Sequence, residues 1–90
     1  MLRIGIIGCG NITKARHAPE YQENPAASLT AFYDSAPERA QALAREYGGR
    51  AYDSIEALLD GGVDAVSVCV ANADHAAVTI QALRAGKHVL

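Results

Sequence analysis

Residues 1–14 read MLRIGIIGCGNITK, and this stretch decides the fold. A short apolar strand over residues 2–7 leads into the turn Gly8-Cys9-Gly10, and a helical pattern follows. Glycines let the main chain turn tightly and approach a ligand with no Cβ in the way. The first turn of the helix adds unpaired N–H groups and the positive end of the helix dipole. This order of parts predicts a dinucleotide phosphate site, although Thr13 stands where a third glycine is usual.

Composition and charge limit the classes of protein to which this chain could belong. The chain has 90 residues, half of them hydrophobic, and a net charge of −2, with its eight Lys and Arg residues scattered. No basic patch for nucleic acid follows from this, and no apolar run approaches the ~20 residues of a membrane helix. Cys9 and Cys69 have no metal-like spacing and no His or Cys cluster beside them. We therefore expect a reduced, soluble cytoplasmic protein with no metal site, no nucleic-acid partner and no membrane partner.

Strand and helix patterns alternate along the whole chain. Apolar runs predict strands at 2–7, 28–33, 50–52, 63–70 and 87–90, and helical spacing predicts helices at 11–23, 38–47, 55–59 and 74–85. Such alternation is typical of right-handed βαβ units. The prediction is an α/β fold: a doubly wound parallel sheet (Rossmann) with strand order 3-2-1-4-5.

Local signals support these boundaries. Ser35-x-x-Glu38 and Asp53-x-x-Glu56 match helix capping patterns, and glycines follow the second, third and fourth helices. In the last helix we expect Ala77, Val78, Ile80 and Leu83 to face inward.

The chain ends at Lys87-His-Val-Leu90, inside a predicted apolar strand. Domain boundaries usually fall in exposed polar linkers. We expect residues 1–90 to be the N-terminal part of a dinucleotide-binding domain, incomplete at its C-terminal end, with the substrate domain outside this chain.

Four residues at the glycine turn are predicted to bind the cofactor. Gly8 and Gly10 would shape the turn, and Asn11 and Ile12 would offer backbone N–H groups to the pyrophosphate. In the alternative interpretation, the two glycines only form the turn between strand and helix and bind no phosphate.

Asp34 ends the second strand, where a carboxylate can accept hydrogen bonds from the adenosine ribose hydroxyls and repel a 2′-phosphate. The alternative is a local cap, because Asp34-Ser35 also precedes a helix. Arg39, one turn into that helix, could reach a 2′-phosphate. NAD is therefore the expected cofactor, and NADP stays open.

The segment after the fourth strand supplies the last candidates. Ligands of open α/β sheets bind at the carboxyl ends of strands near the topological switch point. Ala71, Asn72 and His75 are therefore expected beside the nicotinamide half of the cofactor. Asn72 could equally cap the following helix, and His75 could be an exposed polar residue. The residues offer no catalytic acid or base.

Five motifs occur in a set order: GIIGCGNI (5–12), YDSAPERA (33–40), VDAV (63–66), NADH (72–75) and AGKHV (85–89). Together they resemble the glucose–fructose oxidoreductase / inositol dehydrogenase family over the whole chain. The resemblance implies an enzyme that, when intact, transfers hydride between a nicotinamide cofactor and a sugar or polyol. It also implies a second domain for substrate and for homo-oligomer contacts.

Two features qualify what the resemblance implies. The family usually has Thr or Ser and then Pro before the Asn that Asn72 matches, whereas this chain has Val70-Ala71, so a hydroxyl contact to the cofactor is in doubt. The family's catalytic Lys lies in a Glu-Lys-Pro motif that would follow Leu90. By this reading no catalytic residue lies in the chain, and these 90 residues alone would be inactive.

Three other functions share the first strand, turn and helix. They are a non-catalytic Rossmann nucleotide-sensing domain, the first domain of another dehydrogenase family, and a methyltransferase. A methyltransferase cofactor lacks a pyrophosphate, so a comparison of NADH with S-adenosylmethionine would distinguish it.

Overall fold

The computed structural model describes residues 2–10, 18–70 and 72–90. Five parallel strands form one sheet in the order β3-β2-β1-β4-β5, as predicted. The strands are β1 (Leu2–Ile7), β2 (Ala27–Tyr33), β3 (Arg50–Ala51), β4 (Ala65–Val68) and β5 (His88–Val89). The helices are α1 (Ala18–Glu23), α2 (Pro37–Tyr47), α3 (Ile55–Leu59) and α4 (Asn72–Arg84). Residues 11–17 of the first predicted helix lie outside the described residues.

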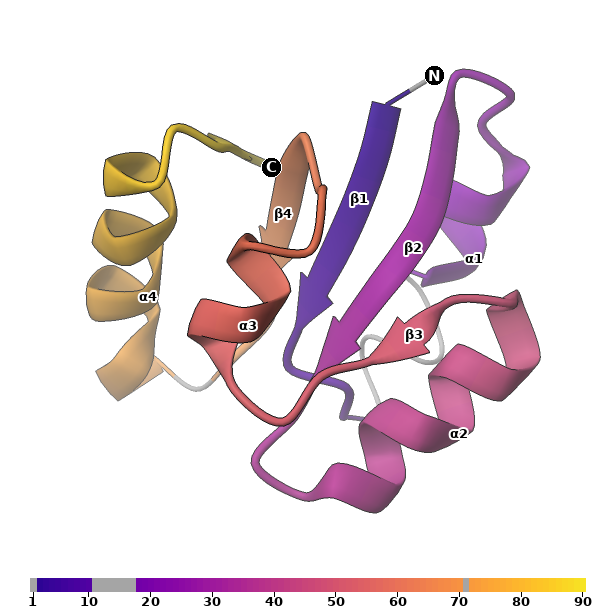
Figure 1. The fold of residues 1–90 in the computed structure, drawn as a ribbon, viewed down its shortest axis with the longest axis horizontal. Coiled ribbons are helices and arrows are strands. Elements are labelled where there is room, and N and C mark those ends of the chain that lie inside the picture. The colour runs from indigo at the N-terminus through magenta and orange to yellow at the C-terminus, as the bar shows by residue number, and fades with distance from the viewer. Residues whose placement is uncertain (1, 11–17, 71) are drawn as a thin grey trace.

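Helices cover both faces of the sheet (Figure 1). One core cluster joins β1, β2 and β4 to α3 and α4, and it includes Ile7, Leu58, Val66 and Val78. The other cluster lies on the opposite face, where Phe32 packs with Leu43 and other residues of α2. A strand buried on both faces needs no alternation of polar and apolar residues, and residues 4–7 of β1 are all buried. The doubly wound architecture is confirmed.

The last helix departs from the prediction. Val78 and Ala82 are buried, but Ile80 is 50% exposed and Leu83 is 57% exposed. The spacing of four residues between Val78 and Ala82 sets the one narrow face that meets the sheet. No described element packs on the side that bears Ile80 and Leu83, so the prediction that they face inward was wrong.

The capping patterns also shift by one residue. Ala36, and not Ser35, is the N-cap of α2, and it makes no side-chain capping bond. Ser54, and not Asp53, caps α3, because its Oγ accepts the N–H of Ala57 at 3.0 Å. Gly48 ends α2 in a left-handed conformation, as expected.

Arg3 and Asp64 tie the start of β1 to the segment before β4. Asp64 accepts the backbone N–H of Arg3 at 2.8 Å, and its two carboxylate oxygens each lie 3.2 Å from a guanidinium nitrogen. These bonds to Arg3 lower the pKa of Asp64 from its ordinary 3.8 to about 2. The carboxylate form is thus favoured in the folded state.

We expect the Arg3–Asp64 pair to affect how the free energy of unfolding changes at acid pH. A group whose pKa is lowered by folding contributes stability above its unfolded pKa, and that contribution disappears as pH falls through the folded pKa. The stabilisation should be complete above pH 3.8 and disappear towards pH 2. Urea unfolding midpoints of wild type and Asp64→Asn, measured from pH 6 to pH 2, should converge at the acid end. Asp60→Asn serves as the control, and a constant gap between wild type and Asp64→Asn would rule the effect out.

Candidate functional site

The glycine turn leaves β1 between the ends of β2 and β4. The N–H of Gly8 donates to the carbonyl of Tyr33 at 2.8 Å, and the N–H of Cys69 donates to the carbonyl of Ile7 at 2.7 Å. Gly8 has φ +101°, and a Cβ there would lie 2.6 Å from the carbonyl oxygen of Cys69. Only glycine fits this conformation and this close approach. Gly8 is therefore required by the fold itself.

Gly10 lies in a different environment. No described atom lies within 4 Å of the position that its Cβ would take, and its φ is not positive. Gly10 instead lines the cavity in front of the turn. The two glycines of the motif therefore have different roles: the backbone conformation requires Gly8, whereas Gly10 lines the cavity and no described atom lies close to its Cβ position.

Asp34 holds the turn and the next helix together. Its side chain is buried, with the residue only 9% exposed. Oδ1 accepts the N–H of Cys9 at 2.8 Å, and Oδ2 accepts the N–H of Ala36 at 2.8 Å. The bond to Ala36 is local but does not cap α2, which has no side-chain capping bond, and the bond to Cys9 ties the carboxylate to the glycine turn. Each oxygen can accept a second hydrogen bond, so this role leaves room for ribose hydroxyls.

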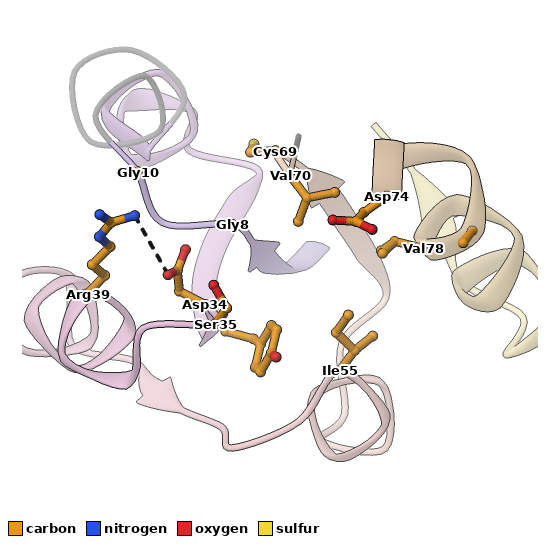
Figure 2. A pocket seen from close by; sticks show the side chains of 12 residues that line it. Gly8, Gly10, Asp34, Ser35, Arg39, Ile55, Cys69, Val70, Asp74 and Val78 are labelled. Carbon is orange, nitrogen blue, oxygen red and sulfur yellow. Dashed lines mark ion pairs between the residues drawn. The ribbon is translucent and has the colours of Figure 1, made fainter. Parts of the chain in front are cut away.

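Arg39 forms a long ion pair with the same carboxylate. Its Nη1 is 4.0 Å from Oδ2 of Asp34, and its side chain is 61% exposed (Figure 2). An ion pair this long and exposed restrains the guanidinium only weakly. Arg39 can therefore turn towards a ligand in the cavity.

A cavity of about 470 Å³ opens at this edge of the sheet. The glycine turn, Asp34, Ser35 and Arg39 form one side of it, and the first turns of α4 form the other (Figure 2). Apolar residues also line the cavity, namely Tyr33, Ile55, Val70, Ala77 and Val78. Ligand sites of open α/β sheets occur at this edge.

The predicted site residues are only partly brought together. Gly8, Gly10, Asp34 and Arg39 all line the cavity. Asn11, Ile12 and Ala71 lie outside the described residues. Asn72 is the first residue of α4. His75 is exposed and does not line the cavity.

Sequence reasoning missed Asp74, which does line the cavity. It lies four residues before the buried Val78, and residues four apart share one face of a helix. That spacing was available in the sequence, but the motif drew attention to His75 instead. The apolar wall residues Ile55 and Val70 were also missed, because their strands and helices are set beside each other only by the tertiary fold.

The thiol of Cys9 packs within the core and is not exposed to the cavity. Burial, with smaller contributions from Asp34 and Cys69, raises its pKa to about 12. Sγ lies 3.3 Å from the carbonyl oxygen of Tyr33, to which the thiol donates. Such a thiol is not a nucleophile at neutral pH. Among residues 2–10, 18–70 and 72–90, no group of His, Cys, Asp and Glu could hold a metal ion.

No helix in the described parts of the chain is both long and apolar enough to cross a membrane. The arrangement offers a glycine turn, a buried carboxylate and a cavity with a polar end and an apolar wall. This combination fits a nucleotide: Gly10 lines the cavity with no described atom near its Cβ position, and each Asp34 oxygen, with one backbone N–H bond, can accept another from a hydroxyl.

Comparisons with known proteins agree with this reading. A family model described as "Oxidoreductase family, NAD-binding Rossmann fold" matches residues 2–90. The dTDP-3,4-didehydro-2,6-dideoxy-alpha-D-glucose 3-reductase of Streptomyces violaceoruber is 42% identical over 90 residues, which cover 99% of this chain and 26% of that protein. The D-glucoside 3-dehydrogenase of Escherichia coli K12 is 42% identical over 91 residues, covering 99% and 26%.

A solved structure matches equally well. The crystal structure of a 3-ketoreductase from Actinomadura kijaniata in complex with NADP and TDP-benzene superposes with a TM-score of 0.93 at 38% identity. The match covers 99% of this chain and 28% of that one. The chain thus spans about a quarter of the length of the relatives it matches.

Proposed function

This chain belongs to the oxidoreductase family with the NAD-binding Rossmann fold, and we propose that its cavity holds a nicotinamide adenine dinucleotide. The observation that carries the proposal is the contrast between the two glycines at the cavity. The backbone of Cys69 leaves no room for a Cβ at Gly8, whereas Gly10 lines the cavity together with Asp34, and no described atom lies within 4 Å of its Cβ position. A pyrophosphate fits at Gly10, with the adenosine ribose hydroxyls on the carboxylate of Asp34.

The charges around the cavity favour NAD over NADP. Among the described residues, its lining contains the carboxylates of Asp34 and Asp74 and the cation Arg39, so the charges of these three groups sum to −1 (two negative, one positive). A 2′-phosphate next to Asp34 would meet a buried negative charge. Arg39 offsets part of this cost, since its guanidinium is free to turn. NADP binding is therefore weaker but not abolished.

The remaining members of the proposed cofactor site stay predictions. Backbone N–H groups of Asn11 and Ile12 would complete the pyrophosphate contacts. Ala71, Asn72 and His75 would lie along the path of the cofactor after β4.

In the whole protein, the proposed activity is hydride transfer between the nicotinamide ring and a sugar or polyol. The relatives support this substrate class, since their names include a D-glucoside 3-dehydrogenase and an inositol 2-dehydrogenase. The cofactor supplies the redox chemistry, and this chain binds and orients it. The substrate pocket, the catalytic residues and the contacts of a homo-oligomer would belong to a part of the protein beyond this sequence. A cytoplasmic location is part of the same proposal.

The test uses the full-length protein and fluorescence titrations with NADH, NADPH and S-adenosylmethionine. We expect NADH to bind at least about tenfold more tightly than NADPH, a difference of about 1.4 kcal/mol, and S-adenosylmethionine not to bind. Turnover is then measured with a panel of sugars and polyols. NADH binding without turnover of any substrate would favour a nucleotide sensor. Equal or tighter NADPH binding would refute the argument from the Asp34 charge.

A further inference from the structure

Asp74 lies in the first turn of α4, and its carboxylate points into the cavity from the side opposite Asp34 (Figure 2). No hydrogen bond or ion pair joins it to another residue in the described parts of the chain. Asp74 is exposed, and its side chain faces the space in which the cofactor is proposed to bind.

The wall next to Asp74 is suited to a flat ring. Ile55, Val70, Ala77 and Val78 line the same cavity as Asp34 and Asp74. Purine rings bind between apolar side chains, while the groups on the ring edge need polar partners. With the ribose on Asp34, the base attached to that ribose extends over this apolar wall. The outer edge of the base then approaches α4.

We propose that Asp74 accepts a hydrogen bond from the 6-amino group of the adenine ring, so that this residue selects the base of the cofactor. The proposal rests on the dinucleotide function above. An ionised carboxylate only accepts hydrogen bonds, and the 6-amino group is the donor on that edge of adenine. Hypoxanthine has a carbonyl oxygen at the same position. Two acceptors would then face each other at that position, and the bond would be lost there, because the donor that hypoxanthine has on this edge is the N1–H at the neighbouring ring position.

The predicted consequence is discrimination between NAD and nicotinamide hypoxanthine dinucleotide. The full-length wild-type protein should bind NADH about tenfold more tightly than the reduced hypoxanthine analogue, in line with a charge-assisted hydrogen bond at a partly exposed site. Asp74→Ala should lower the affinity for NADH about tenfold and leave that for the analogue unchanged. Asp74→Asn should bind both about equally, because an amide can accept from an amino group or donate to a carbonyl.

Asp60→Ala is the matched control, since Asp60 is an exposed acid at the end of α3 that does not line the cavity. It should keep the discrimination of the wild type. If the wild type binds NADH but does not discriminate, or if Asp74→Ala weakens both dinucleotides equally, the role of Asp74 is wrong while the proposed function stands. If Asp74→Ala changes only the affinity for NADPH, Asp74 acts through its charge and the base-selecting role is again wrong. If the wild type binds no dinucleotide, both proposals fail.

Discussion

Gly8→Ala should destabilise the fold by about 2–6 kcal/mol, whereas Gly10→Ala should change the stability little and remove most cofactor binding. At Gly8, alanine would have to adopt φ +101°, at a cost of roughly 1–3 kcal/mol. Its Cβ would also lie 2.6 Å from the carbonyl oxygen of Cys69 and 2.9 Å from the nitrogen of Val70. These are backbone atoms of the neighbouring segment, so relief requires the sheet edge to shift, which costs roughly another 1–3 kcal/mol.

At Gly10 the same added methyl group meets no described atom within 4 Å. It enters the space that the pyrophosphate would occupy, so NADH affinity should fall at least about tenfold, or about 1.4 kcal/mol. Urea unfolding of the two variants without cofactor, followed by NADH titration of Gly10→Ala, checks both parts. A Gly8→Ala variant as stable as wild type would contradict the turn geometry. A Gly10→Ala variant with wild-type affinity would place the pyrophosphate elsewhere.

Asp34→Asn should weaken both the fold and the cofactor site. The carboxylate accepts one backbone N–H on each oxygen, from Cys9 and from Ala36. Asparagine has a single acceptor oxygen, so its NH₂ group would face one of these donors. Leaving a buried donor unsatisfied costs about 1–3 kcal/mol, and Cys9 is only 4% exposed. The loss of stability should therefore appear without any ligand.

The affinity for NADH should fall about tenfold in the same variant, and the preference for NADH over NADPH should shrink because the buried charge is gone. Asp53→Asn, an exposed acid outside the cavity, is the control for both measurements. Affinity is measured at a temperature where circular dichroism shows the variant to be folded. Unchanged stability would mean that the two backbone bonds contribute nothing, and unchanged affinity and selectivity would reject the ribose role.

Most of the fold could be predicted from local patterns. The strand before Gly8, the continuous apolar run around Val66 and the glycine after α2 each reflect short-range physics, namely burial of a parallel strand or a left-handed helix end. The inward face of α4 could not be predicted in the same way. Helical spacing shows that the apolar residues Ile80 and Leu83 lie on one side of α4, but it does not show whether another element packs against that side.

The site was predictable only where a motif marks it. Gly8, Gly10 and Asp34 follow from the order of strand, turn and strand end. The two hydrogen bonds that Asp34 accepts could not be predicted, because one of them depends on the distance between its carboxylate and the N–H of Cys9, 25 residues away. Asp74 was missed although its spacing of four residues from Val78 places both on one face of α4, since only the packing of α4 shows that this face borders the cavity.

The two backbone bonds of Asp34 have a consequence for how a protein of this kind could change its cofactor preference over evolution. Removing the Asp34 charge, which we propose disfavours NADP, would also remove the two hydrogen bonds that connect the β1 turn to the segment before α2. A single substitution at this position would therefore lose folding stability before it gains a new cofactor. Ser35, exposed at the rim of the same cavity, is bound by no such constraint. Adaptation to NADP has an easier route through the residue next to Asp34 than through Asp34 itself.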